Sequence, residues 1–222
     1  MSETKKGLYV VFTGAPGCGK GTQARILKEK THICHLSTGE MLREYAEQDT
    51  PLGRDLKALL DKGEFATDEM IIEMVRNRIG QPDCERGFIL DGFPRTLPQA
   101  EVLESLLAEK GIKLTCVLEI QVPDEIIMER ILGRYSCLKC GAGYHDKFQK
   151  PKVYGVCDVC GGTEFGRRKD DNRATVQNRL VNYRLLTYPT IPFFEKRGLL
   201  RTVDGTGTIE AVSNKIDEIL GI

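Results

Sequence analysis

A glycine-rich loop between an apolar run and a helix-like stretch constrains this chain more than any other feature. Residues 14–22 read Gly-Ala-Pro-Gly-Cys-Gly-Lys-Gly-Thr and follow the apolar run 8–13. A strand, a tight turn and a helix start in this order form a cradle whose backbone N–H groups bind phosphate. An ordinary glycine-rich turn between strand and helix is the alternative, and the flanking segments favour the phosphate site. Lys20 would reach the transferring end of a triphosphate, although Gly21 separates it from Thr22, where the general pattern has the hydroxyl directly after the lysine.

The length and charge of the chain limit the classes of protein it can belong to. Its 222 residues suffice for one sizeable core with small inserted lobes, and are too few for two full enzyme domains. Acidic and basic residues balance at 32 each, so no overall field draws the chain to nucleic acid or to an anionic membrane. No apolar stretch reaches roughly 18 residues, and no signal-peptide core follows the amino terminus. We expect a cytoplasmic monomer that acts on small molecules and binds neither nucleic acid nor membrane.

Strand-like runs alternate with helix-like stretches along most of the chain. The expected strands cover residues 8–13, 33–36, 88–91, 114–122 and 199–203. Such alternation is typical of a parallel sheet with helices on both faces and ligands outside the carboxyl ends of the strands. The predicted fold class is therefore α/β, a P-loop NTPase-type parallel sheet of about five strands flanked by helices.

Capping signals place the starts of several helices. Ser37, Thr50 and Thr67 each precede a helix-like stretch, in positions where their side chains can accept a backbone N–H bond. Near the carboxyl end, Pro189 and Pro192 should bend or break a long helical stretch.

Two segments do not fit the alternation of strands and helices. Residues 133–170 are rich in Gly, Lys, Cys and Tyr and have no long apolar periodicity, which indicates an inserted lobe. Residues 37–66 consist of short helix-like pieces where a minimal unit would have one crossover helix, which indicates a second insertion.

Four cysteines in the first of these insertions have the spacing of a metal site. Cys137, Cys140, Cys157 and Cys160 give the pattern Cys-x2-Cys-x16-Cys-x2-Cys, which can supply four thiolates to a structural zinc ion. Two disulfides are the alternative, which an intracellular setting disfavours. With four thiolates there is no open position for water, so the metal should fold the lobe and take no part in chemistry. His145 is another possible ligand, but a solvent-facing or locally hydrogen-bonded histidine is the favoured interpretation.

The other four cysteines are scattered. Cys34 and Cys116 lie in strand-like runs and are expected to be small buried hydrophobic residues. Cys18 lies in the glycine-rich loop with no partner base nearby in the sequence, and Cys84 stands alone.

A carboxylate follows the third expected strand. Asp91 stands where an acid would reach Mg²⁺ through water. The next residue is Gly92, whereas an NTP hydrolase usually has a group there that activates water. Candidate phosphate-binding cations are Arg43, Arg95, Arg130, Arg134, Arg168 and Arg179.

These motifs together carry a family resemblance. They are Gly-Ala-Pro-Gly-Cys-Gly-Lys-Gly-Thr-Gln at 14–23, Leu-Ser-Thr-Gly-Glu-Met-Leu-Arg at 36–43, Asp-Gly-Phe-Pro-Arg-Thr at 91–96, Arg-Ile-Leu-Gly-Arg at 130–134, the four cysteines, and Arg-Lys-Asp-Asp at 168–171. By these motifs the chain resembles the adenylate kinase family, in the long form whose lid carries a zinc knuckle. The resemblance runs from residue 14 to about residue 205, and the family loop also reads Gly-Lys-Gly-Thr, which accounts for Gly21.

The resemblance implies the reaction MgATP + AMP ⇌ 2 ADP, with Mg²⁺ accompanying ATP and structural Zn²⁺ in the lid. It also implies a core made of residues 1–36, 67–132 and 171–222, a monophosphate-binding lobe at 37–66 and a lid at 133–170. An AMP phosphate oxygen is already anionic at neutral pH, so the acceptor needs no general base. The absence of an evident catalytic His or Asp is therefore expected.

The resemblance also implies roles for single residues. Phosphoryl transfer would depend on Lys20, Arg95, Arg134, Arg168 and Arg179. The ATP site would contain Gly17, Cys18, Gly19, Lys20, Gly21, Thr22, Arg130, Gly143, Tyr144 and Gly207. The AMP site would contain Thr38, Arg43, Glu64, Phe65, Ala66, Gly92, Phe93, Pro94, Arg95, Gln99, Arg168 and Arg179. Asp91 would hold Mg²⁺ through water.

Three positions depart from the commonest form of the family. Glu40 replaces an Asp, Gly143 a Thr and Gly207 often a Lys. The third contributes through its backbone in the family, so only side-chain roles at Gly207 are affected.

Other functions stay open at this point. A related kinase could use GTP as donor, or UMP or CMP as acceptor. A zinc-ribbon P-loop ATPase acting on nucleic acid would need a basic face and a glutamate after Asp91, and the sequence has neither. A structural or sensing nucleotide binder would not explain arginines at both expected phosphate pockets.

Overall fold

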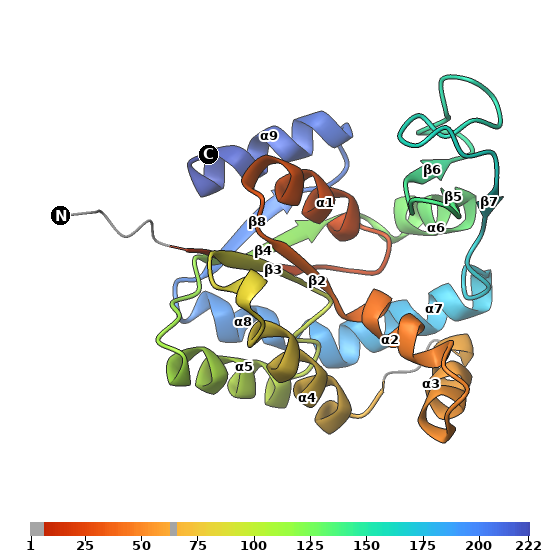
Figure 1. The fold of residues 1–222 in the computed structure, drawn as a ribbon. Helices are drawn as coiled ribbons and strands as arrows, with labels where there is room; N and C mark the ends of the chain where they lie inside the picture. Colours follow the sequence, from red (N-terminus) through yellow and green to blue (C-terminus); the bar gives the residue numbers. More distant parts are fainter. Residues whose placement is uncertain (1–6, 63–65) are drawn as a thin grey trace.

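A five-stranded parallel sheet forms the centre of the molecule (Figure 1). The computed structural model describes residues 7–62 and 66–222. In spatial order the strands are β2 (Cys34–Ser37), β3 (Gly87–Asp91), β1 (Leu8–Thr13), β4 (Cys116–Gln121) and β8 (Leu200–Asp204). Every neighbouring pair is parallel, which confirms the predicted fold class.

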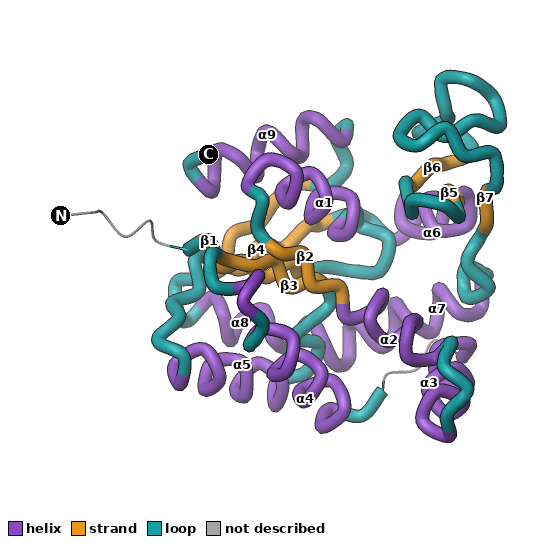
Figure 2. The backbone as a smooth tube through the Cα atoms, viewed as in Figure 1, coloured by secondary structure: helices purple, strands orange, loops and turns teal. Residues whose placement is uncertain are grey.

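Helices connect these strands and cover both faces of the sheet (Figure 2). They are α1 (Lys20–Thr31), α2 (Thr38–Ala46), α3 (Pro51–Lys62), α4 (Asp68–Ile79), the 3-10 turn η1 (Pro82–Cys84), α5 (Leu97–Glu109), α6 (Asp124–Gly133), α7 (Arg173–Asn182), the π-helical turn η2 (Tyr183–Thr187), α8 (Thr190–Glu195) and α9 (Ile209–Leu220).

The predicted caps are present. Ser37 Oγ accepts from Glu40 N at 3.3 Å, and Thr67 Oγ1 accepts from Met70 N at 3.4 Å. Thr50 Oγ1 accepts from the backbone N–H of a residue in the first turn of α3, at 3.0 Å. These bonds satisfy amide groups that have no partner inside the helix.

Alternate side chains of the central strands pack into two hydrophobic cores, one on each face of the sheet. Val10 and Phe12 of β1 pack with α1 and α9 on one face, whereas Val11 packs with α4, α5 and α8 on the other. Because both faces are covered, these strands are nearly continuous apolar runs, and all three of these side chains are 0–1% exposed.

The long helical stretch near the carboxyl end is interrupted, but only one of the two prolines marks the break. The helix widens into η2 after α7, and α8 restarts after Pro189, which is its N-cap residue. The prediction that Pro192 breaks the helix is wrong. Pro192 lies in the first turn of α8, where a residue without an N–H group costs no intrahelical bond.

The segment from residue 134 to 166 contains a sheet of its own. Strands β6 (Gly143–His145), β5 (Arg134–Cys137) and β7 (Phe165–Gly166) are antiparallel, in that order, and most of the chain between them is loop (Figure 2). In Figure 1 this small sheet and the pair α2–α3 extend from the same side of the body.

The prediction for the scattered cysteines is half right. Cys116 is buried at 3% exposure, as expected for a strand inside the sheet. The prediction for Cys34 is wrong, since it is only partly buried. The reason is the strand order: β2 is the outermost strand, and no neighbour covers it on one side.

Among the described residues, no helix has both the length and the apolar character needed to cross a membrane.

Candidate functional site

The glycine-rich loop leaves the carboxyl end of the central strand β1 and enters α1. Gly17 and Gly19 have φ values of +79° and +110°, which side-chain-bearing residues rarely adopt. A Cβ atom at Gly17 would lie 2.6 Å from Ile131 of α6, so α6 packs directly on the loop. At Gly19 a Cβ would meet no described atom within 4 Å, which is consistent with an open, ligand-facing side of the loop.

Lys20, the first residue of α1, bends back over this loop. Its Nζ donates to the carbonyls of Gly14 at 2.7 Å and Ala15 at 2.9 Å, and lies 3.5 Å from Cys18 Sγ. The carbonyls hold the ammonium group at the loop without neutralising its charge. An incoming phosphate can therefore replace them as the partner of Lys20.

Asp91 lies beside the start of α1. It ends β3 and pairs in register with Ser37 of β2, and its Oδ2 is 3.4 Å from the position of a Cβ at Gly21. Oδ2 also lies 3.3 Å from His35 Nε2. Burial acts to raise the pKa of Asp91, but the His35 hydrogen bond and the charge of Lys20 outweigh it, so the pKa lies below its usual value. Asp91 is thus an ionised carboxylate next to the loop, as an indirect ligand of Mg²⁺ must be.

A cluster of polar side chains around Arg95 lies where α2, β3 and α5 meet. Arg95 Nε donates to Gly92 O at 2.7 Å, and Thr38 Oγ1 donates to the same carbonyl at 2.9 Å. Gln99 accepts from Arg95 N through Oε1 at 2.7 Å and donates to Asp68 through Nε2, also at 2.7 Å. A Cβ at Gly92 would lie 2.8 Å from both Arg95 Nη2 and Thr38 Oγ1, so only glycine leaves room for this arrangement. Burial lowers the pKa of Arg95 to about 10.

Two acidic residues orient arginines of this region. Asp171 accepts from Arg134 Nε and Nη2, both at 2.5 Å, and Asp170 accepts from Arg179 Nη2. Both carboxylates belong to the segment between the small sheet and α7, so this segment fixes guanidinium groups from either side of it.

The arginines interact with one another as well as with these carboxylates. Burial lowers the pKa of Arg43, and the charges of Arg134 and Arg179 lower it further. Burial likewise lowers the pKa of Arg168 to about 10, with contributions from Arg134 and Arg43. The charges of Arg179 and Arg43 also lower the pKa of Arg95. Five of the six predicted phosphate-binding arginines, all but Arg130, therefore converge in space, and Asp170 and Asp171 offset only part of their charge.

Arg130 joins the glycine-rich loop to the loop after β8. Its Nη2 donates to Gly205 O at 2.9 Å and its Nη1 donates to Cys18 O at 3.5 Å. Gly207 lies two residues farther along, before α9, and is exposed. The structure thus brings these two residues of the predicted ATP site to one side of the loop.

The small sheet contains the other two residues predicted for that site. Arg25 of α1 donates to the carbonyl of Gly141, and a Cβ at Gly143 would lie 3.3 Å from the Arg25 guanidinium. Tyr144 is buried, stacks on Tyr135 with ring centroids 5.8 Å apart, and has its hydroxyl bonded to the cysteine cluster. The ring of Tyr144 is therefore part of the core of the small sheet.

Cys137, Cys140, Cys157 and Cys160 form one cluster. Their Sγ atoms all lie within 4.8 Å of one another, with 3.6 Å between Cys137 and Cys160 and between Cys140 and Cys157. This donor set suits a soft-site metal such as Zn²⁺ in tetrahedral coordination.

Two equivalent turns present these thiols. Gly141 N donates to Cys137 O and Gly161 N donates to Cys157 O, each at 2.9 Å. Gly141 and Gly161 adopt φ values of +73° and +68°. His145 is not a member of the cluster. Its ring accepts backbone N–H bonds through Nδ1 and is buried, which confirms the locally hydrogen-bonded interpretation.

The remaining predicted AMP-site residues lie near the polar cluster around Arg95 or outside the described residues. Phe93 and Pro94 are buried between β3 and Arg95, and Ala66 is buried before α4. Glu64 and Phe65 lie outside the described residues.

Several polar residues of the site were not singled out from the sequence. His35 supports Asp91, Asp68 supports Gln99, and Asp170 and Asp171 orient arginines. Asp170 and Asp171 follow Arg168 directly, and an acidic pair in an arginine motif is a usable signal. His35 lies two residues before the capping serine of α2, and only the pairing of β2 with β3 relates it to Asp91.

The chain is similar in sequence to proteins of one known family. The family model described as "Adenylate kinase" matches residues 12–199. Among curated relatives named "Adenylate kinase", that of Paramagnetospirillum magneticum is 50% identical over 213 residues, which cover 96% of this chain and 98% of the relative. That of Carboxydothermus hydrogenoformans is also 50% identical, covering 96% and 99%. That of Clostridium tetani is 46% identical over 214 residues, again covering 96% and 99%.

Proposed function

This chain belongs to the adenylate kinase family, and we propose that it transfers the terminal phosphoryl group of MgATP to AMP, giving two ADP. The donor would bind at the glycine-rich loop and the acceptor at the polar cluster around Arg95. The observation that carries the assignment of two nucleotide sites is the convergence of five arginines, in addition to Lys20 of the glycine-rich loop. A protein that binds one nucleotide needs one set of cations. Two anionic substrates that repel each other need cations around both and between them.

The proposed donor site is the glycine-rich loop with Lys20, and Arg130 beside the base. Backbone N–H groups of residues 17–22 would cradle the phosphates of ATP, together with the N-terminus of α1. Asp91 would hold Mg²⁺ through water. When bound with ATP, Mg²⁺ neutralises charge on the phosphate oxygens. Gly143, Tyr144 and Gly207 would complete the site around the base.

The proposed acceptor site is the pocket around Arg95. Arg43 and Arg95 would bind the phosphate of AMP, and Thr38 and Gln99 its base. The contacts that Arg95 and Gln99 make with Gly92 and Asp68 support this role, because they fix both side chains before the substrate arrives. Residues 64–66 and the turn 92–94 would line the rest of the pocket.

Transfer between these sites needs alignment and charge stabilisation. The attacking oxygen of AMP is already anionic, so no residue has to remove a proton. Arg134, Arg168 and Arg179 would surround the transferring phosphoryl group, with Asp170 and Asp171 holding two of the three in place. Water competes as an acceptor, so the lobe 37–66 and the lid 133–170 would have to cover the site during transfer.

The division of the chain follows from these roles. We assign residues 1–36, 67–132 and 171–222 to the core, 37–66 to the monophosphate-binding lobe and 133–170 to the lid. The separate small sheet within 133–170 and the pairing of α2 with α3 support these boundaries. We also propose that the protein works as a cytoplasmic monomer and does not bind nucleic acid, a view that the balanced charge supports.

A panel of monophosphates tests this function. The protein is mixed with MgATP and one of AMP, UMP, CMP or GMP, and the nucleotides are then separated and quantified. Diphosphate should form fastest with AMP. With no monophosphate present, ATP consumption should be lower by at least about a hundredfold, because water is a poor acceptor when excluded. Equal ATP consumption with and without AMP would contradict the proposal, and a preference for UMP or CMP would reassign the acceptor base.

Removal of the lid metal should affect stability more than turnover. Structural zinc contributes folding energy, so a chelator should lower the thermal midpoint by at least about 4 °C, since a chain of this size loses about 2–4 °C per kcal/mol. Turnover below the transition, assayed with excess Mg²⁺, should stay within about threefold of the untreated rate.

Scanning calorimetry with and without added zinc measures this effect. Zinc should restore the midpoint, and a Cys157→Ser variant should have a low midpoint without any chelator. A metal-free protein as heat-stable as the zinc-loaded one would show that the ion has no structural role.

A further inference from the structure

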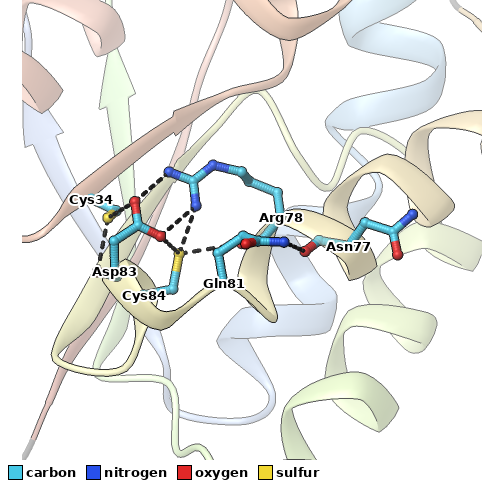
Figure 3. A network of polar contacts seen from close by, with 6 residues as sticks. All are labelled: Cys34, Asn77, Arg78, Gln81, Asp83 and Cys84. Carbon is cyan, nitrogen blue, oxygen red and sulfur yellow. Dashed lines mark hydrogen bonds and ion pairs between the residues drawn. The ribbon is translucent and has the colours of Figure 1, made fainter.

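A second group of metal-ligating side chains lies away from the nucleotide pockets. Cys34 is the first residue of the outermost strand β2, and Asp83 and Cys84 lie in η1, after α4 (Figure 3). Arg78, in the last turn of α4, points into the same group. The nucleotide-facing residues follow the carboxyl ends of the strands, whereas this cluster lies at the amino end of β2.

The three potential ligands are already close together. Cys34 Sγ donates to Asp83 Oδ2 at 3.0 Å and lies 2.9 Å from Asp83 O, and Cys84 Sγ is 3.7 Å from Asp83 Oδ1. One ligand atom from each residue lies within 4.8 Å of the other two. With metal–ligand bonds of about 2.0–2.3 Å, ligand atoms of a tetrahedral zinc site are about 3.5–3.8 Å apart. Small side-chain rotations would therefore bring all three to one ion.

Arg78 holds the carboxylate without using up its binding capacity. Its Nη1 and Nη2 donate to Asp83 Oδ1 and Oδ2 at 2.8 and 2.7 Å. A carboxylate offers about four lone-pair positions, so it can bond the guanidinium on one side and an ion on the other. Nη1 also lies 3.2 Å from Cys84 Sγ. Such hydrogen bonds to the ligands are what outer partners of metal sites provide.

An ion can bind here without leaving net charge on the cluster, provided that both thiols ionise. Two thiolates and one carboxylate supply three negative charges, and a divalent cation with the Arg78 guanidinium supplies three positive charges. In the ion-free protein the thiols carry protons, because burial raises the pKa of Cys34 and raises that of Cys84 to about 12. A cation would displace these protons.

Burial argues against a disulfide formed by an external oxidant as the role of this pair. Cys84 is 1% exposed, so such an oxidant has little access to its sulfur.

We propose that Cys34, Asp83 and Cys84 form a second metal site, which binds a thiophilic divalent cation of the zinc class with Arg78 as its outer partner. The mixed sulfur and oxygen ligands fit this class, and the exposed side of Asp83 leaves the fourth position to water. The ion is structural, because the cluster lies at the amino end of β2 and shares no residue with the predicted nucleotide site.

This ion would join the start of β2 to the turn after α4. Cys34 is three residues before Ser37, where the chain enters α2, and Arg78 lies in the last turn of α4. The ion would therefore hold to the core one of the two connections of the monophosphate-binding lobe, the one that runs through β2.

Cadmium substitution tests the proposal on the full chain. Metal-free protein is loaded with an NMR-active cadmium isotope, which reports by its chemical shift whether four thiolates or two thiolates with oxygen bind the ion. The wild type should show two resonances and bind two ions per chain. Cys34→Ser should lose the thiolate–oxygen resonance and one ion, and keep the four-thiolate resonance of the lid.

Two further variants complete the test. Cys116→Ser removes a buried thiol that is not near either site, and should keep both resonances. Asp83→Asn changes a largely exposed side chain, so it should fold even if Cys34→Ser does not, and should lose the same resonance.

One ion per chain in the wild type would overturn the proposal, as would equal binding by wild type and Asp83→Asn. Formation of a Cys34–Cys84 disulfide in place of metal binding would overturn it too. Phosphoryl transfer is not measured, so failure here would leave the proposed function untouched.

Discussion

Replacement of Lys20 by methionine should lower kcat by about a thousandfold, the range observed when one preorganised charge or donor is removed from a developing anion. Methionine keeps the length and the apolar stem of lysine but has no positive charge. In the free protein the ammonium group donates to the carbonyls of Gly14 and Ala15 and lies 3.5 Å from Cys18 Sγ. Phosphate oxygens can replace these two carbonyls as partners of the ammonium group. The substitution should therefore weaken mainly the stabilisation of the transition state.

Steady-state kinetics with saturating AMP and MgATP measures this loss. Lys28→Met changes an exposed lysine in the same helix and should leave kcat within about twofold. The thermal midpoint of Lys20→Met should stay within a few degrees of the wild type, because Lys20 is only partly buried. A Lys20→Met protein that retained a tenth of the wild-type kcat would show that Lys20 does not contact the transferring group.

Arg95→Ala should reduce kcat/KM for AMP by at least about a hundredfold while KM for ATP changes by less than about threefold. Loss of one partner from a buried charge pair costs about 2–5 kcal/mol, and a hundredfold corresponds to about 2.7 kcal/mol. The asymmetry follows from position. Arg95 contacts Gly92 and Gln99, after β3, whereas the glycine-rich loop follows the neighbouring strand β1.

Initial rates with each substrate varied in turn separate the two effects. Arg197→Ala is the matched control, since Arg197 pairs with Glu104 on α5 and has no predicted phosphate contact. Arg197→Ala should leave kcat/KM for AMP and KM for ATP near their wild-type values. An equal loss for AMP and ATP in Arg95→Ala would contradict the assignment of Arg95 to the acceptor pocket.

The sheet could be predicted from the sequence because its physical signal is local. A parallel strand covered on both faces is a short apolar run between turn signals, as in the stretch from Phe88 to Asp91. Each of the five expected strands lies within two residues of the observed one. Helix starts were equally predictable, because a serine or threonine cap acts within its own turn.

Features that depend on neighbours distant in sequence could not be predicted in this way. Pro192 has the same local signal as Pro189, and only the restart of α8 after Pro189 makes it harmless. Cys34 has the same strand context as Cys116, and only the outermost position of β2 exposes it. His35 and Asp91 are 56 residues apart, and strand pairing brings them together.

The resemblance of the chain to its family supplied the site residues, and the structure supplies the partners that make them usable. The motif 168–171 points to Arg168 but does not say that Asp170 binds Arg179 or that Asp171 binds Arg134. These pairings join residues 170 and 171 to β5 and α7, and they need coordinates to be seen.

The crowding of Arg43, Arg95, Arg168 and Arg179 has a consequence for engineering. The charge of Arg43 lowers the pKa of Arg95 and Arg168, and the charge of Arg179 lowers the pKa of Arg43 and Arg95, so the nucleotide-free protein holds like charges together at a cost in folding free energy. A screen for heat resistance that scored folding alone would therefore select substitutions of these arginines early. The selected variants would be more stable proteins and poor catalysts. Thermostable enzymes are therefore better sought with substrate present during selection.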